Sequence, residues 1–388
     1  MLIIISNRNR TRSINPVPGI YNLDTLGQGL DENNNNIVGE VIKSDEGDKL
    51  HLYPDSHSVG FMQSIKDRID SGDNELNRPW VLFVHGNNQS IEKNIKKVKK
   101  LESSRKVNVI AFSWPSQPLG EALQKTEIVK NILFKAVTNS LSSVIDPTNI
   151  FSQGSKILKN YYDNYKLARK HASASVDNFI KAVEFLNDNL LNTIPFTNKH
   201  ALFHSLGHKI LRDTIEGGAI PFDTANKFSS IVLHQADEDS EEHENWVSQL
   251  AQYTESLYIT QNVHDGILWA AGIANQQERL GHSTYRHVAS KATYITFTYG
   301  YNIHEKHNMF NMTITGKNDN EHVAMLFDRI LHGYEDKLPR QGDRMPTSMG
   351  FAKLRDNPYV FSLVELYDIF EDEETVDVRE NPDLQDDM

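Results

Sequence analysis

The chain has 388 residues, enough for a large domain with a sizeable core. Its net charge of −12 argues against nucleic-acid binding, which usually requires a basic surface. It contains no cysteine, which excludes disulfides, thiolate chemistry and cysteine-based zinc sites and fits a reducing compartment. We therefore expect a cytoplasmic protein, with secretion by a signal-less route left open.

The first 77 residues are predicted to form an extension packed on the core. LIIIS (2–6) reads as a buried strand, because no basic segment precedes it as in a signal peptide. Residues 7–35, rich in Asn, Gly and Pro, predict a long loop. A hairpin is expected over 38–54 and a helix over 58–70.

From residue 78 to 335, apolar runs alternate with amphipathic segments. The predicted strands are 80–86, 107–115, 199–205, 228–237, 256–265 and 291–300. The predicted helices are 90–104, 173–191, 206–218, 244–254 and 322–333. This order predicts an α/β fold, with a mostly parallel sheet covered by helices on both faces.

Two segments depart from the alternation. Residues 116–170 predict a helical insertion, either extra packing helices or a lid that binds an acyl group. No run of the chain reaches the roughly 18–20 apolar residues of a membrane span, so we expect none. Residues 336–388 are expected to be a C-terminal extension ending in an acidic, solvated tail.

The stretch LFHSLGHKIL (202–211) places Ser205 between a strand and a helix. It is close to the nucleophile elbow G-x-S-x-G, although Phe203 stands where the first glycine should be. Such a turn lifts the hydroxyl above the sheet and aims the next amide, that of Leu206, at a developing oxyanion. His204 and His208 are expected to pack or hydrogen-bond around the turn.

The stretch FVHGNN (83–88) ends another predicted strand. The amide of Asn87 could serve as a second oxyanion donor, and Gly86 would let the backbone approach a substrate closely. An ordinary strand-to-helix turn, with Asn88 or Ser90 as the helix N-cap, explains the same residues. Catalytic groups of parallel sheets lie at the carboxyl ends of strands, where Ser205 also stands.

These segments together resemble a known family. WVLFVHGNN, VIAFSWPS and HALFHSLGHKILRDTI are similar to strand ends of the α/β-hydrolase superfamily. They are most similar to an uncharacterised bacterial esterase- or lipase-like group with a Ser-Asp-His triad. The spacing from Asp265 to RLG (279–281) also resembles that group.

The resemblance implies a role for each matching residue. Ser205 would be the nucleophile, and the amides of Asn87 and Leu206 would form the oxyanion hole. Asp265 is the preferred acid and Asp237, one strand earlier, the alternative.

The choice of the catalytic base is open among three histidines. His322, at the start of a predicted helix, matches the group's histidine best, and His307 and His304 also qualify by their order in the chain. HEKH (304–307) and HSTYRH (282–287) lack the spacing of a metal site, so we expect no metal and no cofactor.

The sequence therefore predicts a serine hydrolase that cleaves carboxylic esters, with a small-molecule or lipid ester as its partner. A peptidase or amidase on the same fold would use the same triad. A non-catalytic binding or assembly protein with this fold is the third hypothesis, because a fold does not guarantee chemistry.

Overall fold

The computed structural model describes residues 1–116, 156–283, 288–333, 351–354 and 357–363. Most of the predicted insertion and the acidic tail therefore lie outside the described residues. The lid hypothesis lies outside them too.

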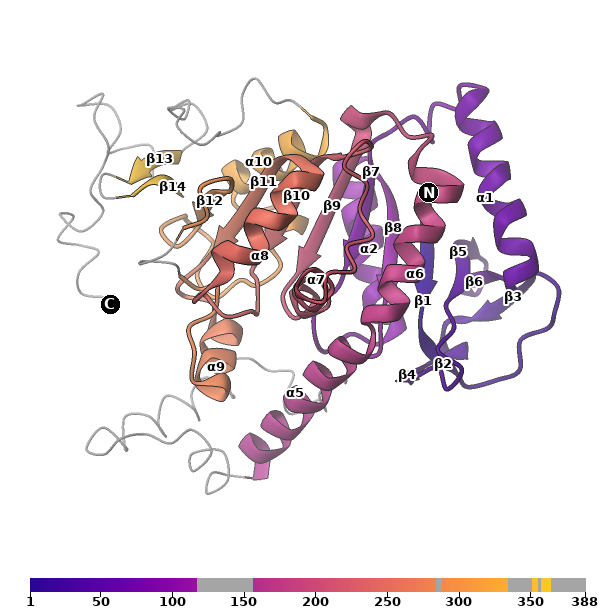
Figure 1. Ribbon diagram of the computed structural model, residues 1–388, viewed down its shortest axis with the longest axis horizontal. Coiled ribbons are helices and arrows are strands. Elements are labelled where there is room, and N and C mark those ends of the chain that lie inside the picture. The colour runs from indigo at the N-terminus through magenta and orange to yellow at the C-terminus, as the bar shows by residue number, and fades with distance from the viewer. Residues whose placement is uncertain (117–155, 284–287, 334–350, 355–356, 364–388) are drawn as a thin grey trace.

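A mixed sheet runs through the described part of the chain (Figure 1). In sheet order its strands are β13 (Phe351–Leu354), β14 (Asn357–Leu363), β12 (Thr293–Thr296), β11 (Thr254–Gln261), β10 (Phe228–His234), β9 (Lys199–His204), β7 (Trp80–Val84), β8 (Asn108–Ser113), β1 (Leu2–Ser6), β5 (Ile37–Ser44), β6 (Gly47–Tyr53) and β3 (Gly19–Asn22). From β14 to β1 every neighbouring pair is parallel, and antiparallel strands are added at both edges. The predicted mostly parallel sheet is confirmed.

Helices cover both faces of this sheet. The α-helices of the described residues are α1 (Asp55–Asp70), α2 (Ile91–Arg105), α5 (Lys156–Ala174), α6 (Val176–Leu186), α7 (Gly207–Glu216), α8 (His243–Leu250), α9 (Gly266–Asn275) and α10 (Glu321–Leu331). One apolar core joins the sheet to α1, α6, α7 and α8, and the other joins it to α2 and α10. Strand side chains alternate between the two cores: Leu82 and Val84 enter the first, and Phe83 enters the second.

The N-terminal segment differs from its prediction. Residues 7–35 contain the short strands β2 (Arg8–Arg10), β3 and β4 (Leu26–Leu30), where a loop is predicted. β2 pairs with β4, and β3 pairs with the outer strand of the predicted hairpin. Strand pairing across the fold thus orders a segment whose local composition favours a loop.

The C-terminal segment also joins the sheet. β14 lies parallel to β12, and β13 lies antiparallel to β14, although both follow the predicted end of the domain at residue 335. The predicted helix over 173–191 is divided between the end of α5, α6 and a π-helical turn, Asn187–Leu191.

Candidate active site

Ser205 occupies the turn between β9 and α7 in a strained conformation. Its φ is +51°, in the left-handed region that non-glycine residues rarely adopt. The turn is held by the neighbouring strand, because the Ser205 amide donates to His234 O at 3.1 Å and Ser205 O accepts the Asp237 amide at 3.3 Å. A serine kept in such a turn at a strand end is the geometry of a nucleophile elbow.

Two glycines let the elbow press against the end of β7. A Cβ at Gly207 would lie 2.7 Å from His85 O, and one at Gly86 would lie 2.6 Å from Ser205 Cβ. Neither distance is compatible with a side chain, so both positions need glycine. Phe203, the departure from the elbow pattern, points into the core and packs edge-on against Phe179, with ring centroids 6.0 Å apart. The turn thus closes without a small residue two places before the serine.

Residues 85–89 follow β7 and are called here the 85–89 turn. This turn faces the elbow and contains Asn87. Among the described residues, no acceptor takes the amide hydrogen of Asn87 or that of Leu206. His85 braces the turn: Nδ1 donates to Gly86 O at 2.7 Å, and Nε2 accepts the Trp114 amide at 3.2 Å. Burial holds the pKa of His85 well below its ordinary value, which keeps the imidazole neutral.

Arg8 braces the same turn from β2. Its guanidinium donates to Gln89 O at 2.8 Å and to Ser113 Oγ at 3.0 Å, and burial lowers its pKa to about 9. The Gln89 amide in turn donates to Ser116 Oγ at 2.9 Å. Pattern reasoning missed Arg8, because a buried arginine whose partners are carbonyls and hydroxyls has no sequence signature.

Asp265 and His307 form a carboxylate–imidazole pair. Asp265 caps α9, with Oδ1 accepting the amides of Ile267 (3.0 Å) and Leu268 (3.2 Å). Its Oδ2 lies 2.5 Å from His307 Nδ1. The side chain of Gln235, with its nitrogen turned toward the site, donates to the same Oδ2 at 2.9 Å. The carboxylate oxygen at Nδ1 accepts the ring proton of a neutral His307 there, which leaves the lone pair on Nε2.

His307 belongs to an irregular segment, residues 304–309, here the 304–309 loop. Asn262, at the end of β11, donates to His304 O at 2.7 Å and to Lys306 O at 3.3 Å. The His307 ring lies 4.7 Å, centroid to centroid, from the ring of His204, the residue before Ser205. The loop therefore brings the imidazole beside the elbow across the ends of three adjacent strands.

A comparison with protein families matches residues 63–298 to the model described as "Alpha/beta hydrolase of unknown function (DUF900)". The chain belongs to this α/β-hydrolase family. Comparisons with curated proteins and with solved structures gave no match. The matched segment of the hydrolase includes the elbow, the 85–89 turn and Asp265, but ends before the 304–309 loop.

The other candidate residues of this α/β-hydrolase lie in different surroundings. Asp237 Oδ1 accepts the Tyr165 hydroxyl at 3.0 Å and lies 3.8 Å from Arg279, and burial raises the pKa of Asp237. The interactions of this carboxylate are thus with α5 and Arg279. His304 stands at a positive φ of 37°, and its carbonyl is taken by Asn262.

His322, the base preferred from sequence, is not the histidine that pairs with Asp265. It lies in the first turn of α10, with Nε2 4.0 Å from the Glu321 carboxylate. Its Nδ1 is buried and has no hydrogen-bond partner among the residues that the structure describes. His322 is preferred from sequence because it stands at the start of a helix, which is α10. Asp265 instead bonds His307, in the loop that precedes α10. The geometry therefore favours His307, the second choice.

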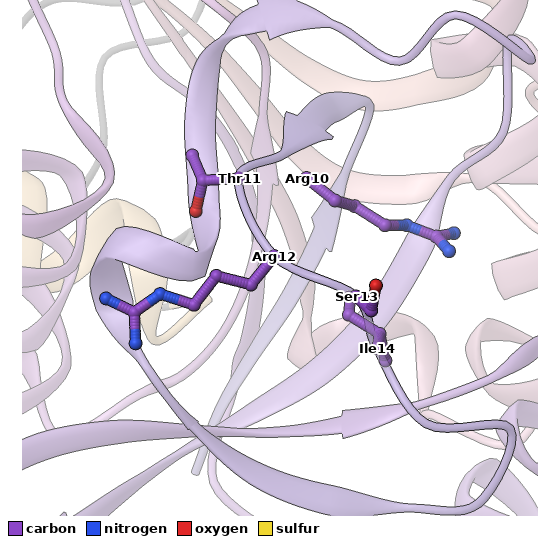
Figure 2. Close-up of a pocket in the computed structure, with 5 residues that line it drawn as sticks. All are labelled: Arg10, Thr11, Arg12, Ser13 and Ile14. Atoms are coloured by element: carbon purple, nitrogen blue, oxygen red, sulfur yellow. The ribbon is translucent and has the colours of Figure 1, made fainter.

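One cavity lies apart from these groups (Figure 2). It has a volume of about 520 Å³ and is lined by consecutive residues 10–14. Arg10 and Arg12 point away from each other in Figure 2, and Arg12 pairs with Asp24 at 2.9 Å. None of its lining residues belongs to the candidate site.

Metal-binding clusters and membrane-spanning helices are both absent from the described residues of the hydrolase. Over those ranges, no three His, Asp or Glu side chains gather as they would around a metal ion. No helix there has the length and apolar character to cross a membrane.

Proposed function

We propose that this α/β-hydrolase cleaves carboxylic esters through an acyl-enzyme formed on Ser205. The observation that carries the proposal is the pairing of Asp265 with His307 beside a serine in a left-handed turn. Family membership supports a hydrolase-type function. The choice of base and acid is supported by the bond between His307 and Asp265. The choice of nucleophile is supported by the turn at Ser205, whose preceding residue, His204, packs against the His307 ring.

The proposed reaction has two steps, acylation of Ser205 and hydrolysis of the acyl-enzyme, and the same residues act in both. Ser205 Oγ attacks the ester carbonyl while His307 Nε2 takes the hydroxyl proton. Asp265 holds the imidazole and stabilises the imidazolium, and the amides of Leu206 and Asn87 receive the oxyanion. The proton then passes from His307 to the departing alkoxide. Water, activated by the same histidine, hydrolyses the acyl-enzyme and restores the serine.

The helix after Asp265 supports an ester with an apolar group. α9 has the sequence GILWAAGIAN, without a charged side chain, and lies beyond the carboxyl ends of the strands (Figure 1). Ile267, Trp269 and Ile273 on it remain partly exposed. An apolar wall next to the triad acid would favour burial of an alkyl chain.

The test combines an active-site probe with substrate hydrolysis. A fluorophosphonate should label Ser205 in the folded protein, with the site identified by mass spectrometry. Ser205→Ala should abolish labelling and lower the kcat for p-nitrophenyl butyrate by about 10⁴-fold or more. Ser58→Ala, which alters a buried serine on α1, is the matched control and should keep full activity.

Three results would separate the competing hypotheses. Full activity in Ser205→Ala would refute the nucleophile assignment. An unlabelled, well-folded wild-type protein would favour the non-catalytic hypothesis. Faster turnover of p-nitroanilides than of the matching esters would favour a peptidase or amidase.

A further inference from the structure

Two buried histidines that the proposed reaction does not use hold the loop that carries His307. They are His204 and His234, the last residues of the adjacent strands β9 and β10, which face each other in the parallel register. His204 Nε2 lies 2.9 Å from His307 O, and His234 Nε2 lies 3.2 Å from the Met309 amide nitrogen. The two contacts thus flank Asn308, on either side of a single residue.

The partners of these imidazoles determine where their protons lie. A carbonyl only accepts, so His204 must carry its proton on Nε2 to bond His307 O. An amide only donates, so His234 Nε2 must be the lone-pair nitrogen, with its Nδ1 proton donated to Thr260 Oγ1 at 2.7 Å. The two histidines therefore need opposite neutral tautomers. Protonation of His234 at Nε2 would break its bond to the loop.

The surroundings keep both rings neutral. Phe310, just past the loop, packs edge-on against both rings, with centroids 5.3 Å from each. Burial lowers the pKa of His204 and of His234 well below the ordinary value. Bonds between neutral groups in a dry environment are well suited to fix a main chain in one orientation.

We propose that His204 and His234 are positioning residues, which hold the 304–309 loop so that the His307 imidazole meets Ser205 and Asp265 together. This inference rests on the proposed function for its catalytic consequence, but the hydrogen bonds themselves do not. His204 joins the nucleophile to the base directly, because it precedes Ser205 in the chain and bonds the carbonyl of His307. A displacement of about 1 Å at a reacting group can cost on the order of 100-fold in rate.

The kinetic test compares two replacements at position 204. His204→Leu removes the donor but keeps the volume, and should lower kcat for p-nitrophenyl butyrate by roughly 10–100-fold with little change in KM. His204→Gln restores an amide donor near the position of Nε2 and should recover much of the loss. The matched control is His200→Leu, an equally buried histidine on β9 bonded to Ser230, which lies about 13 Å toward the other end of the strand.

A spectroscopic test does not depend on turnover. In ¹⁵N-edited NMR of the full chain, His204 should be protonated at Nε2 and His234 at Nδ1. The Nδ1 proton of His307, bonded to Asp265, should give a strongly deshielded signal that His204→Leu shifts or abolishes and His200→Leu preserves.

The outcomes separate this inference from the proposed function. Unchanged kcat in His204→Leu, or equal losses in His204→Leu, His204→Gln and His200→Leu, would overturn the positioning role. The reverse tautomers, or an undisturbed His307 signal in His204→Leu, would overturn it even in a protein without esterase activity. A wild type with the expected NMR signals but no labelling of Ser205 would retain the loop anchors and reject the ester chemistry.

Discussion

The turn that carries Ser205 and the loop that carries His307 meet at one site but are built differently. The elbow is a tight turn between a strand and a helix. It can approach the end of β7 closely because Gly86 and Gly207 have no side chains. The 304–309 loop is not closed by such a steric contact. Its main-chain atoms are held by hydrogen bonds to the side chains of Asn262, His204 and His234. Local sterics therefore shape the turn at Ser205, whereas hydrogen bonds from residues distant in the sequence hold the main chain around His307.

The sharpest way to break this comparison is to exchange the two candidate bases. His307→Gln should lower kcat/KM for p-nitrophenyl butyrate on the order of 10⁴-fold, because it removes the proton acceptor. His322→Gln should stay within about threefold of wild type, since His307 and not His322 bonds Asp265. The opposite ranking in the steady-state assay would return the role to His322 and remove the loop from the mechanism.

A smaller effect tests the steric half of the comparison. Gly207→Ala should destabilise the fold by about 2–3 kcal/mol, because the new Cβ would collide with backbone oxygens of Val84 and His85. Gly60→Ala, in the middle of α1 with open space around it, should instead add about 0.5–1 kcal/mol of helix stability. Urea unfolding of both variants measures the difference. Equal stabilities would mean that the contact between the elbow and the 85–89 turn is not tight.

The smallest effect concerns the neutral histidines beneath both regions. Burial lowers the pKa of His200 to about 3. Between pH 6.5 and about pH 3, His200 therefore binds a proton in the unfolded chain but not in the folded chain. As the pH is lowered from 6.5 to about 3, this histidine should therefore decrease the free energy of unfolding by about 1.4 kcal/mol per pH unit. Asp237 and Glu238, whose pKa values burial raises, act in the opposite sense.

The contribution of one histidine is isolated by a difference measurement. Unfolding free energies of wild type and His200→Leu, measured between pH 6 and pH 4, should differ in slope by about 1.4 kcal/mol per unit. Parallel pH profiles would show that His200 titrates normally in the folded state.

The amino-acid sequence by itself determined the parallel sheet, the family and the elbow candidates. Each of these depends on neighbours in the chain: an apolar run followed by a helix, a serine two places before Gly207, or the spacing from Asp265 to RLG (279–281). Phe203 did not prevent the turn, because its side chain points into the core.

Only the tertiary structure decided which histidine meets Asp265. With 16 histidines, order along the chain leaves several candidates, and His322 drew attention because helix starts are recognisable in sequence. His307 lies in a loop whose position depends on side chains 103 and 75 residues away from the atoms they bond. Such long-range hydrogen bonds leave no periodic pattern, so the pairing of His307 with Asp265, unlike the turn at Ser205, could be recognised only once the strands were placed side by side.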